Sequence, residues 1–253
     1  MPTLPPEQDP RLRPAAYPRA AHYPLDWMFA AHMGPNVLWL TEALTSQMDL
    51  RPGMRVLDLG CGRALSSIFL VREYGAQVWA ADLWIAPEEN AERLRAANVA
   101  DRAFPLRVEA HTLPFAADFF DAVVSLDAYH YFGTDELYLG WHLLKHLKPG
   151  GQIGICVPGL AEEFAAVPAH LAPYWDWQFW SFHSAAWWRR HWEKTGLVTV
   201  THADRLPDGA AHWQGWDEAL HDHGRVTDTT EADMLRADAG RALGFSRVVA
   251  VKK

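Results

Sequence analysis

The chain has 253 residues, of which 49% are hydrophobic and 21% charged, a composition typical of a globular protein built as one large domain. The formal charge of -8 argues against a nucleic-acid-binding surface, because phosphate contacts need clustered lysine and arginine. The two cysteines, Cys61 and Cys156, are too few for a disulfide framework or a cysteine-rich zinc site. No apolar run approaches the roughly 20 residues of a membrane span, and residues 1–18 lack the apolar core of a signal peptide, so we expect a cytoplasmic protein.

Taken in chain order, residues 1–24 are rich in proline and predict a loosely ordered arm. A helix is expected from Asn36, and strands and helices then alternate from Met54 onward. The predicted strands are 54–59, 77–81, 104–110, 121–125 and 152–157, and the predicted helices are 65–73, 87–97 and 135–147, the last one closed by residues 149–151. This order predicts an α/β fold with a mostly parallel sheet covered on both faces.

After Pro158 the alternation stops for about 35 residues that are rich in tryptophan. Eight of the 13 tryptophans fall between Trp175 and Trp216. The alternation then resumes, with a helix at 187–194, a strand at 198–203, helical stretches near Trp216 and Glu231, and a last strand at 246–251. We expect residues 1–50 to form an N-terminal arm and helical cap, and residues 51–253 to form the main domain with an aromatic insertion at about 159–186.

The first strand-to-helix junction concentrates the residues suited to binding a ligand. Gly60 and Gly62 let the backbone pass close to a ligand, and the helix N-terminus that follows favours polar or anionic groups. Asp58 precedes them at the strand end, and Asp82 closes the second strand, where an acid can accept both hydroxyls of a ribose. The alternative is a plain tight turn with a helix-capping aspartate.

Four motifs in order resemble the class I S-adenosylmethionine-dependent methyltransferases, specifically the small-molecule group often labelled type 11. They read VLDLGCGRA at 56–64, VWAADLW at 78–84, EAHTLPFAADFFDAVVSLDAYHYF at 109–132 and LKHLKPGGQIGI at 144–155. The resemblance implies a Rossmann-like, seven-stranded, mostly parallel sheet with an antiparallel last strand, S-adenosyl-L-methionine as cofactor and S-adenosyl-L-homocysteine as product. Ala64 stands where the family often has a third glycine.

The resemblance also assigns the cofactor-binding positions, motif by motif. It places Asp58 near the amino-acid end of the cofactor, Gly60, Cys61 and Gly62 in the loop that approaches it, Asp82 on the ribose, Leu83 on the adenine or ribose face, Glu109, Ala110 and His111 at the adenine, and Ser125 with Leu126 on the sulfur side.

The methyl acceptor is expected to lie after the fourth strand. A Pro-Pro-aromatic motif and a Pro-Cys nucleophile are both absent there, so direct SN2 transfer remains, with a base needed only for a protonated acceptor. His130 is the candidate base because its ordinary pKa is near neutrality, and Asp127 is a weaker alternative. Tyr129 and Tyr131 are expected to shape the pocket; His130 and these tyrosines could equally be packing residues.

Three further candidates for substrate contact come from outside this loop. His32 precedes the first predicted helix, and N-terminal helices often cover the site in this superfamily. Trp177 and Trp180, in the aromatic segment 174–183, could enclose a flat or cationic molecule, or could simply attach the insertion to the sheet. We expect no metal site: His221 and His223 are two apart on a predicted helix, so they point in different directions.

The hypothesis that follows is transfer of a methyl group from S-adenosylmethionine to the nitrogen, oxygen or sulfur of a small organic acceptor, without nucleic acid or membrane as partner. A nucleotide-cofactor oxidoreductase is one alternative, although residue 65 is leucine where the dinucleotide fingerprint has its third glycine. A non-catalytic S-adenosylmethionine-binding or interaction protein is the other. The acceptor and the oligomeric state stay open.

Overall fold

The computed structural model describes residues 5–253, which fold around one seven-stranded sheet with the order β3-β2-β1-β4-β5-β7-β6. Strands β1 to β5 run parallel, and β7 is antiparallel to both β5 and β6, as the sequence motifs imply. The strands are β1 (Arg55–Leu59), β2 (Gln77–Asp82), β3 (Ala103–Arg107), β4 (Phe120–Leu126), β5 (Leu147–Leu160), β6 (Val198–Arg205) and β7 (Leu243–Lys252). The strand order reverses between β1 and β4, which is where open α/β sheets bind ligands.

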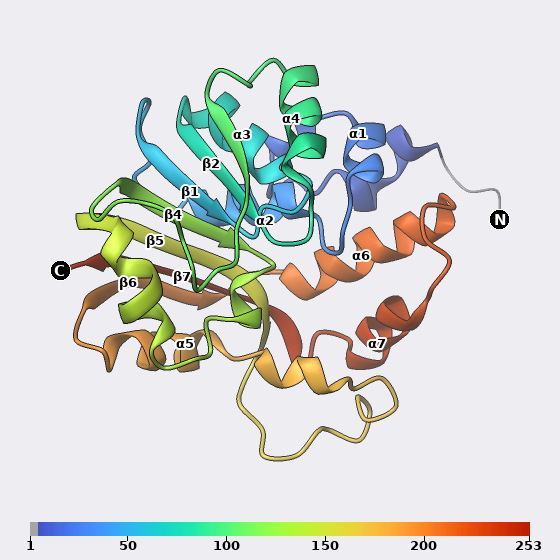
Figure 1. The fold of residues 1–253 in the computed structure, drawn as a ribbon. Coiled ribbons are helices and arrows are strands. Elements are labelled where there is room, and N and C mark those ends of the chain that lie inside the picture. The colour runs from blue at the N-terminus through green and yellow to red at the C-terminus, as the bar shows by residue number, and fades with distance from the viewer. Residues whose placement is uncertain (1–4) are drawn as a thin grey trace.

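Helices cover both faces of this sheet (Figure 1). The α-helices are α1 (Leu25–Ala30), α2 (Val37–Thr45), α3 (Leu65–Tyr74), α4 (Pro87–Ala96), α5 (Ala185–Glu193), α6 (Gly209–Asp222) and α7 (Thr230–Asp238). The shorter helical turns are η1 (Pro6–Gln8), η2 (Pro10–Leu12), η3 (Ala20–His22), η4 (Tyr129–Tyr131), η5 (Tyr138–Leu143), η6 (Leu144–His146) and η7 (Trp177–Ser181). No helix between residues 5 and 253 is both long and apolar enough to cross a membrane.

Alternation along the strands divides the interior into two hydrophobic clusters. In β1, Val56 packs with α2 and α3 on one face, while Leu57 and Leu59 belong to the cluster on the other face with α5. Because successive side chains of a strand point to opposite faces, a strand buried on both sides is apolar almost throughout. Asp58 is a polar exception inside β1, and it is fully buried.

The predicted helix at 135–147 is wrong in type and in extent. The structure has a π-helical turn, η5, followed by the 3-10 turn η6, and β5 begins already at Leu147. Gly140 lowers the helix propensity of this segment, and an isolated stretch this short depends on packing for its conformation. The strand then continues through residues 149–151, which were expected to be a turn.

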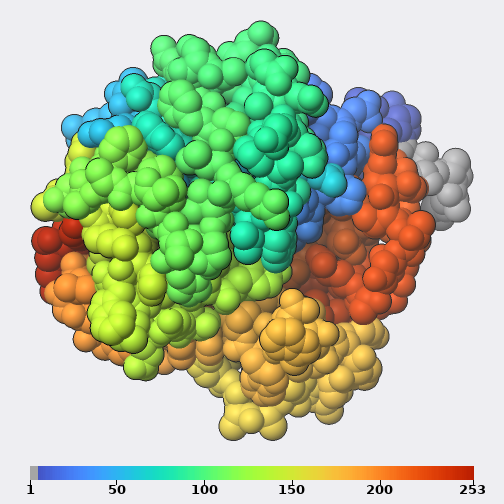
Figure 2. Space-filling model, in the orientation of Figure 1, coloured from blue at the N-terminus to red at the C-terminus, as the bar shows by residue number. Residues whose placement is uncertain are grey.

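The N-terminal arm is also more ordered than expected. Between residues 5 and 24, three short helical turns follow one another, and Leu12, Tyr17 and Tyr23 are buried in the cluster that includes α2 and α3. Residues 1–4 of the predicted arm lie outside the described residues. Figures 1 and 2 show this dark-blue segment beside α6, in orange, so the arm packs against a helix from the C-terminal part of the chain.

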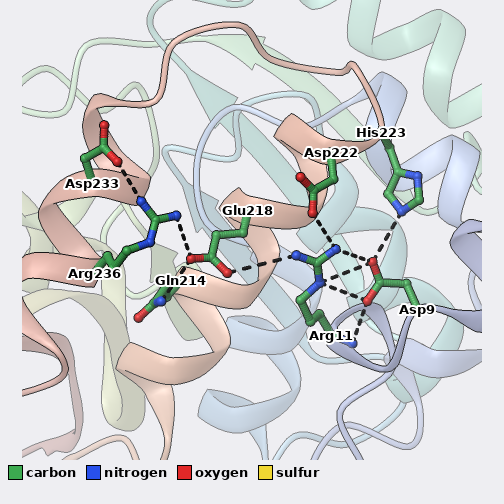
Figure 3. A network of polar contacts seen from close by, with 8 residues as sticks. All are labelled: Asp9, Arg11, Gln214, Glu218, Asp222, His223, Asp233 and Arg236. Carbon is green, nitrogen blue, oxygen red and sulfur yellow. Dashed lines mark hydrogen bonds and ion pairs between the residues drawn. The ribbon is translucent and has the colours of Figure 1, made fainter. Parts of the chain in front are cut away.

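A network of charged side chains holds the arm to the C-terminal helices (Figure 3). Asp9 is almost fully buried and accepts hydrogen bonds from the backbone and guanidinium of Arg11, and its Oδ2 also lies 3.3 Å from Nε2 of His223. Arg11 forms an ion pair of 2.9 Å with Asp222. Glu218 carries the network on to residues of α6 and α7, namely Gln214, Arg236 and, through Arg236, Asp233. The hydrogen bond from Arg11 holds the pKa of Asp9 below its ordinary value, so the carboxylate is charged at neutral pH.

Candidate active site

A cavity of about 330 Å³ opens at the carboxyl ends of β1, β2 and β4. Its walls come from the α1–α2 connection, the loop after β1, the turn after β2, the segment after β3, the segment after β4 and helix α6. In Figure 2 the surface is recessed where the blue-green, orange and red segments meet. Eleven of the sequence-predicted site residues line the cavity: His32, Gly60, Cys61, Gly62, Asp82, Leu83, Glu109, Ala110, His111, Leu126 and Tyr131. Asp127, the weaker base candidate, lines it as well.

The loop after β1 forms one wall of the cavity with backbone rather than side chains. Gly60 has φ +76°, and a side chain there would place its first carbon 2.3 Å from Cβ of Ala128. Gly62 has φ +52° and is faced by the thioether of Met33. Both positions therefore require glycine, and Ala64 completes the turn into α3 in the left-handed conformation with no polar side chain to cap the helix.

Asp82 holds two loops together at the edge of the cavity. Its Oδ2 accepts the backbone N–H of Gly62 at 2.8 Å, and its Oδ1 accepts those of Trp84 and Ile85 at 2.8 and 3.0 Å. A carboxylate offers about four lone-pair positions, so one remains for a ligand hydroxyl while all three backbone bonds are kept. The carboxylate of Asp82 thus fixes the two loops of the site and can also accept a hydrogen bond from a ligand hydroxyl.

Glu109 and His111 form a pair on the β3 side of the cavity. The two oxygens of Glu109 accept from the backbone N–H of His111 at 2.9 Å and lie 2.7 Å from its Nδ1. Burial acts to raise the pKa of Glu109, but the hydrogen bonds from the side chain and backbone of His111 outweigh it and lower the pKa. His111 in turn is held through its carbonyl by His142 at 2.7 Å. The pair is a fixed acceptor surface where the adenine was expected.

Asp58 lies beneath the glycine loop instead of on the cavity wall. Its Oδ2 accepts from the hydroxyls of Ser66 and Ser67, both at 2.6 Å, and its Oδ1 has no hydrogen-bond partner within residues 5–253. Burial raises the pKa of Asp58 to about 6, although the two serine hydroxyls act to lower it. The side chain therefore fixes α3 to the end of β1, and the structure does not bring it to the cavity.

We expect Asp58→Asn to flatten the pH dependence of stability. Because the folded-state pKa is raised, Asp58 contributes stability that is fully present below its unfolded pKa near 3.8 and is lost as the pH rises through about 6. The difference amounts to about 3 kcal/mol at 1.36 kcal/mol for each pKa unit. Urea unfolding of the wild type and the variant, from about pH 4 to about pH 7.5, measures it by linkage. The wild type should lose stability relative to the variant over this interval; parallel curves would contradict the assignment.

Three of the residues expected near the sulfur and the acceptor do not line the cavity. Ser125 donates to the carbonyl of Leu59 at 2.7 Å and so joins β4 to β1. Tyr129 is fully buried, with its ring against Trp188 and Trp192. His130 is almost fully buried, packs against Phe182, and has a pKa lowered to about 3 by burial. The 3-10 turn η4 (Tyr129–Tyr131) thus directs Tyr129 and His130 inward. Tyr131 is the one residue of this turn that lines the cavity.

The aromatic insertion also lies away from the cavity in this conformation. Trp177 and Trp180 are 78% and 51% exposed, and neither lines the cavity. Trp175 and Phe179 attach the segment by packing against the cluster beneath it. The proposed contact of Trp177 and Trp180 with substrate stays a prediction.

Several cavity residues were unassigned from the sequence or assigned only weakly, and five of them bear on ligand binding. They are Met33 on the α1–α2 connection, Arg63 in the glycine loop, Trp84 after β2, Asp127 after β4 and Trp216 on α6. Asp127 was named only as a weaker base, and Arg63 stands inside a recognised motif, so both could have been assigned. Met33 and Trp216 come from distant segments with no local motif, and no sequence signal identifies them.

The residues present fit S-adenosylmethionine. The glycine loop leaves room for a ligand next to the backbone, Asp82 retains an acceptor position for a ribose hydroxyl, and Glu109 faces the cavity two strands away from β1. Arg63 donates through Nη1 to the carbonyls of Ala30 and His32, while its buried Nε has no partner among the described residues. That orphaned donor suits an anionic group such as the cofactor carboxylate. Among residues 5–253, no group of three or more His, Cys, Asp or Glu is placed to hold a metal ion.

Comparison with known proteins agrees with this geometry. Residues 56–151 match the family model described as "Methyltransferase domain". Among curated relatives, "Methyltransferase GfsG" of Streptomyces halstedii is 31% identical over 118 residues, which is 46% of this chain and 42% of that protein. The chain therefore spans less than half the length of this relative.

Solved structures extend the similarity to most of the fold. Geranyl diphosphate C-methyltransferase from Streptomyces coelicolor, in complex with S-adenosyl-L-homocysteine, has a TM-score of 0.68 at 18% identity, covering 84% of this chain and 78% of that one. The [4+2]-cyclase SpnF has a TM-score of 0.63 at 17% identity, covering 88% and 83%. The second neighbour is a cyclase by name, so the fold alone does not specify the reaction.

The strand order, the positions of the four motifs and the family match lead to the same classification. Residues 56–151 are similar to a methyltransferase domain, and the sheet has the strand order of the class I fold that the motifs resemble.

Proposed function

We propose that the protein transfers a methyl group from S-adenosylmethionine to a small organic acceptor. The observation that carries this proposal is that Gly60, Gly62, Asp82 and Glu109 line the same cavity at the carboxyl ends of the strands. The bound cofactor would supply an electrophilic methyl group on a sulfonium. Asp82 would bind the ribose, Glu109 the adenine amino group, and Arg63 the carboxylate of the methionine moiety.

The contribution of the protein to the reaction is positioning and exclusion of water. The sulfonium already activates the methyl group, so the chain has to hold the acceptor in line with it. Met28, Phe132 and Trp216 give the cavity an apolar lining, which keeps water from competing with the acceptor. Residues 28–37 contribute one wall, which supports a division into a cap at 1–50 and a methyltransferase domain at 51–253 with the insertion at about 159–186.

The acceptor we propose is a small molecule dissolved in the cytoplasm. The excess of 31 acidic over 23 basic residues disfavours nucleic acid as a substrate, because a basic surface is needed to bind phosphates.

Two measurements test the proposal. Calorimetric titration with S-adenosylmethionine and with NAD should show binding of the first and not of the second, and tight NAD binding would favour an oxidoreductase. Incubation of a metabolite pool with methyl-labelled cofactor should then give a labelled small molecule and S-adenosylhomocysteine in equal amounts. Cofactor binding without any labelled product would favour a non-catalytic protein, or a reaction other than methylation.

A further inference from the structure

Asp127 occupies an unusual backbone position at the end of β4. Its φ is +51°, in the left-handed region that most residues avoid, and its N–H donates to the carbonyl of Cys156 at 2.9 Å. This conformation turns the chain out of β4 and brings the carboxylate to the cavity wall. In the sheet, β4 is two positions from β2, so Asp127 is on the order of 10 Å from Asp82 at the usual strand spacing.

The carboxylate of Asp127 lies on the cavity wall next to the α1–α2 connection. Its Oδ2 lies 3.1 Å from the point where a side chain on Gly34 would begin, and the carbonyl of Gly34 accepts from Nε1 of Trp216 at 3.0 Å. Neither carboxylate oxygen has a hydrogen-bond donor or a cationic partner anywhere in residues 5–253. This half-buried carboxylate lines the cavity without a protein partner, so it is available to a donor or a cation of a ligand.

Several aromatic side chains line the cavity together with Asp127. Trp216, Tyr131 and Phe132 line the cavity with it, and rings of this kind attract a cation over their faces. No lysine of residues 5–253 lines the cavity, and the guanidinium of Arg63 is turned to the carbonyls of Ala30 and His32. The surroundings of Asp127 thus favour a positively charged ligand group, whereas the anionic carboxylate of the cofactor would bind at Arg63.

A second carboxylate, Glu231 of α7, strengthens the negative field. Burial raises the pKa of Asp127 well above its ordinary value, and the charge of Glu231 raises it further. Burial likewise raises the pKa of Glu231 to about 7, while a hydrogen bond from Nε1 of Trp213 opposes that shift. A cation bound beside Asp127 would favour its charged form, and a carboxylate of raised pKa is a suitable proton acceptor near neutral pH.

We infer that Asp127 binds the acceptor as a protonated amine and takes its proton before methyl transfer. The inference rests on the proposed function and narrows its substrate class to amines. The ammonium gives one proton to the Asp127 carboxylate, leaving a neutral amine and a carboxylic acid. The nitrogen lone pair then forms the new N–C bond while the C–S bond breaks, its electron pair staying on sulfur. The products are a methylated ammonium and the neutral thioether, and Asp127 returns its proton to solvent.

The test compares two probes of the same shape that differ in charge. Benzylamine and benzyl alcohol are titrated into the complex with S-adenosylhomocysteine, for the wild type, Asp127→Asn and Asp101→Asn. Asn tolerates the left-handed conformation at 127, so folding should be preserved. Asp101 is an exposed acid outside the cavity and controls for the change in net charge.

We expect benzylamine to bind the wild type at least about tenfold more tightly than benzyl alcohol, since an ion-paired hydrogen bond is worth that much or more. Asp127→Asn should remove this preference, while Asp101→Asn keeps it and both variants bind S-adenosylhomocysteine within about twofold of the wild type. With benzylamine as methyl acceptor, turnover of Asp127→Asn should fall by about 100-fold, the usual effect of removing a general base.

Three outcomes would contradict the inference that Asp127 binds an amine. Equal affinity for the two probes, or no benzylamine binding, would exclude an amine site. Loss of S-adenosylhomocysteine binding in Asp127→Asn would make Asp127 a cofactor ligand. Labelled product from a hydroxyl or thiol compound of the metabolite pool, with amines unused, would overturn the inference and leave the proposed function intact. Failure of the wild type to bind the cofactor at all would instead refute the proposed function.

Discussion

We expect Trp188→Ala to lower the free energy of unfolding by about 3–5 kcal/mol, the range for removing a fully buried large aromatic side chain. Trp188 is 0% exposed and lies on α5, where its ring packs edge-on against Tyr129 at 5.6 Å between centroids. The substitution would leave a cavity between α5 and the sheet, which surrounding side chains can only partly fill. Urea unfolding followed by circular dichroism measures the change.

Trp177→Ala is the matched control for this prediction. Trp177 belongs to the same tryptophan-rich region but is 78% exposed, so its removal should change stability by less than about 0.5 kcal/mol. Cofactor affinity should be unchanged in both variants because neither ring lines the cavity. Equal losses of stability in the two variants would show that the side chain of Trp177 is buried in solution, which would contradict its exposed position. If Trp188→Ala does not fold, Trp188→Phe should show a smaller loss of the same sign.

Asp82→Ala should weaken S-adenosylmethionine binding by at least about 2 kcal/mol, or about 30-fold. The reason is twofold. The variant loses the acceptor for a ribose hydroxyl, and it also releases the backbone N–H groups of Gly62, Trp84 and Ile85, which set the shape of the cavity wall. Calorimetric titration measures the affinity, and unfolding should show a parallel loss of about 2 kcal/mol in stability.

Asp82→Asn separates the two contributions. The amide oxygen can replace Oδ1 and still accept from Trp84 and Ile85, whereas the amide NH₂ would meet the N–H of Gly62 donor against donor. Asp82→Asn should therefore be more stable than Asp82→Ala, while its affinity for S-adenosylmethionine stays as low as that of Asp82→Ala. Affinity close to that of the wild type in Asp82→Asn would mean that the cofactor does not use this carboxylate.

The fold between residues 54 and 126 could be predicted because local pattern and tertiary structure agree there. Buried strands such as β1 are mostly apolar, and β1 and β2 are each followed by a helix with clear boundaries. The segment 135–147 failed because its helical pattern competes with Gly140 and with the early start of β5. The prediction of a loosely ordered arm was wrong because its buried residues, such as Tyr17 and Tyr23, have no regular spacing that a sequence pattern could reveal.

The site was predictable where backbone geometry determines it, and not where side-chain direction does. Gly60, Gly62 and Asp82 follow strands whose ends meet at one edge of the sheet, so their meeting follows from topology alone. His130 and Tyr131 are adjacent in the sequence, but the turn of η4 sends one into the interior and the other to the cavity. A sequence read without the turn type cannot distinguish them.

The attachment of the arm to α6 has a consequence for how the protein folds. The contact between Asp9 and His223 joins residues 214 positions apart, and that between Gly34 and Trp216 joins residues 182 apart. Closing such loops costs conformational entropy before any contact repays it, so these contacts should form late in folding. The wall that carries Gly34 and Trp216 is then assembled last. A partly folded chain cannot bind a ligand at that wall, and a ligand that fills the cavity should slow the release of the arm and protect it from proteolysis.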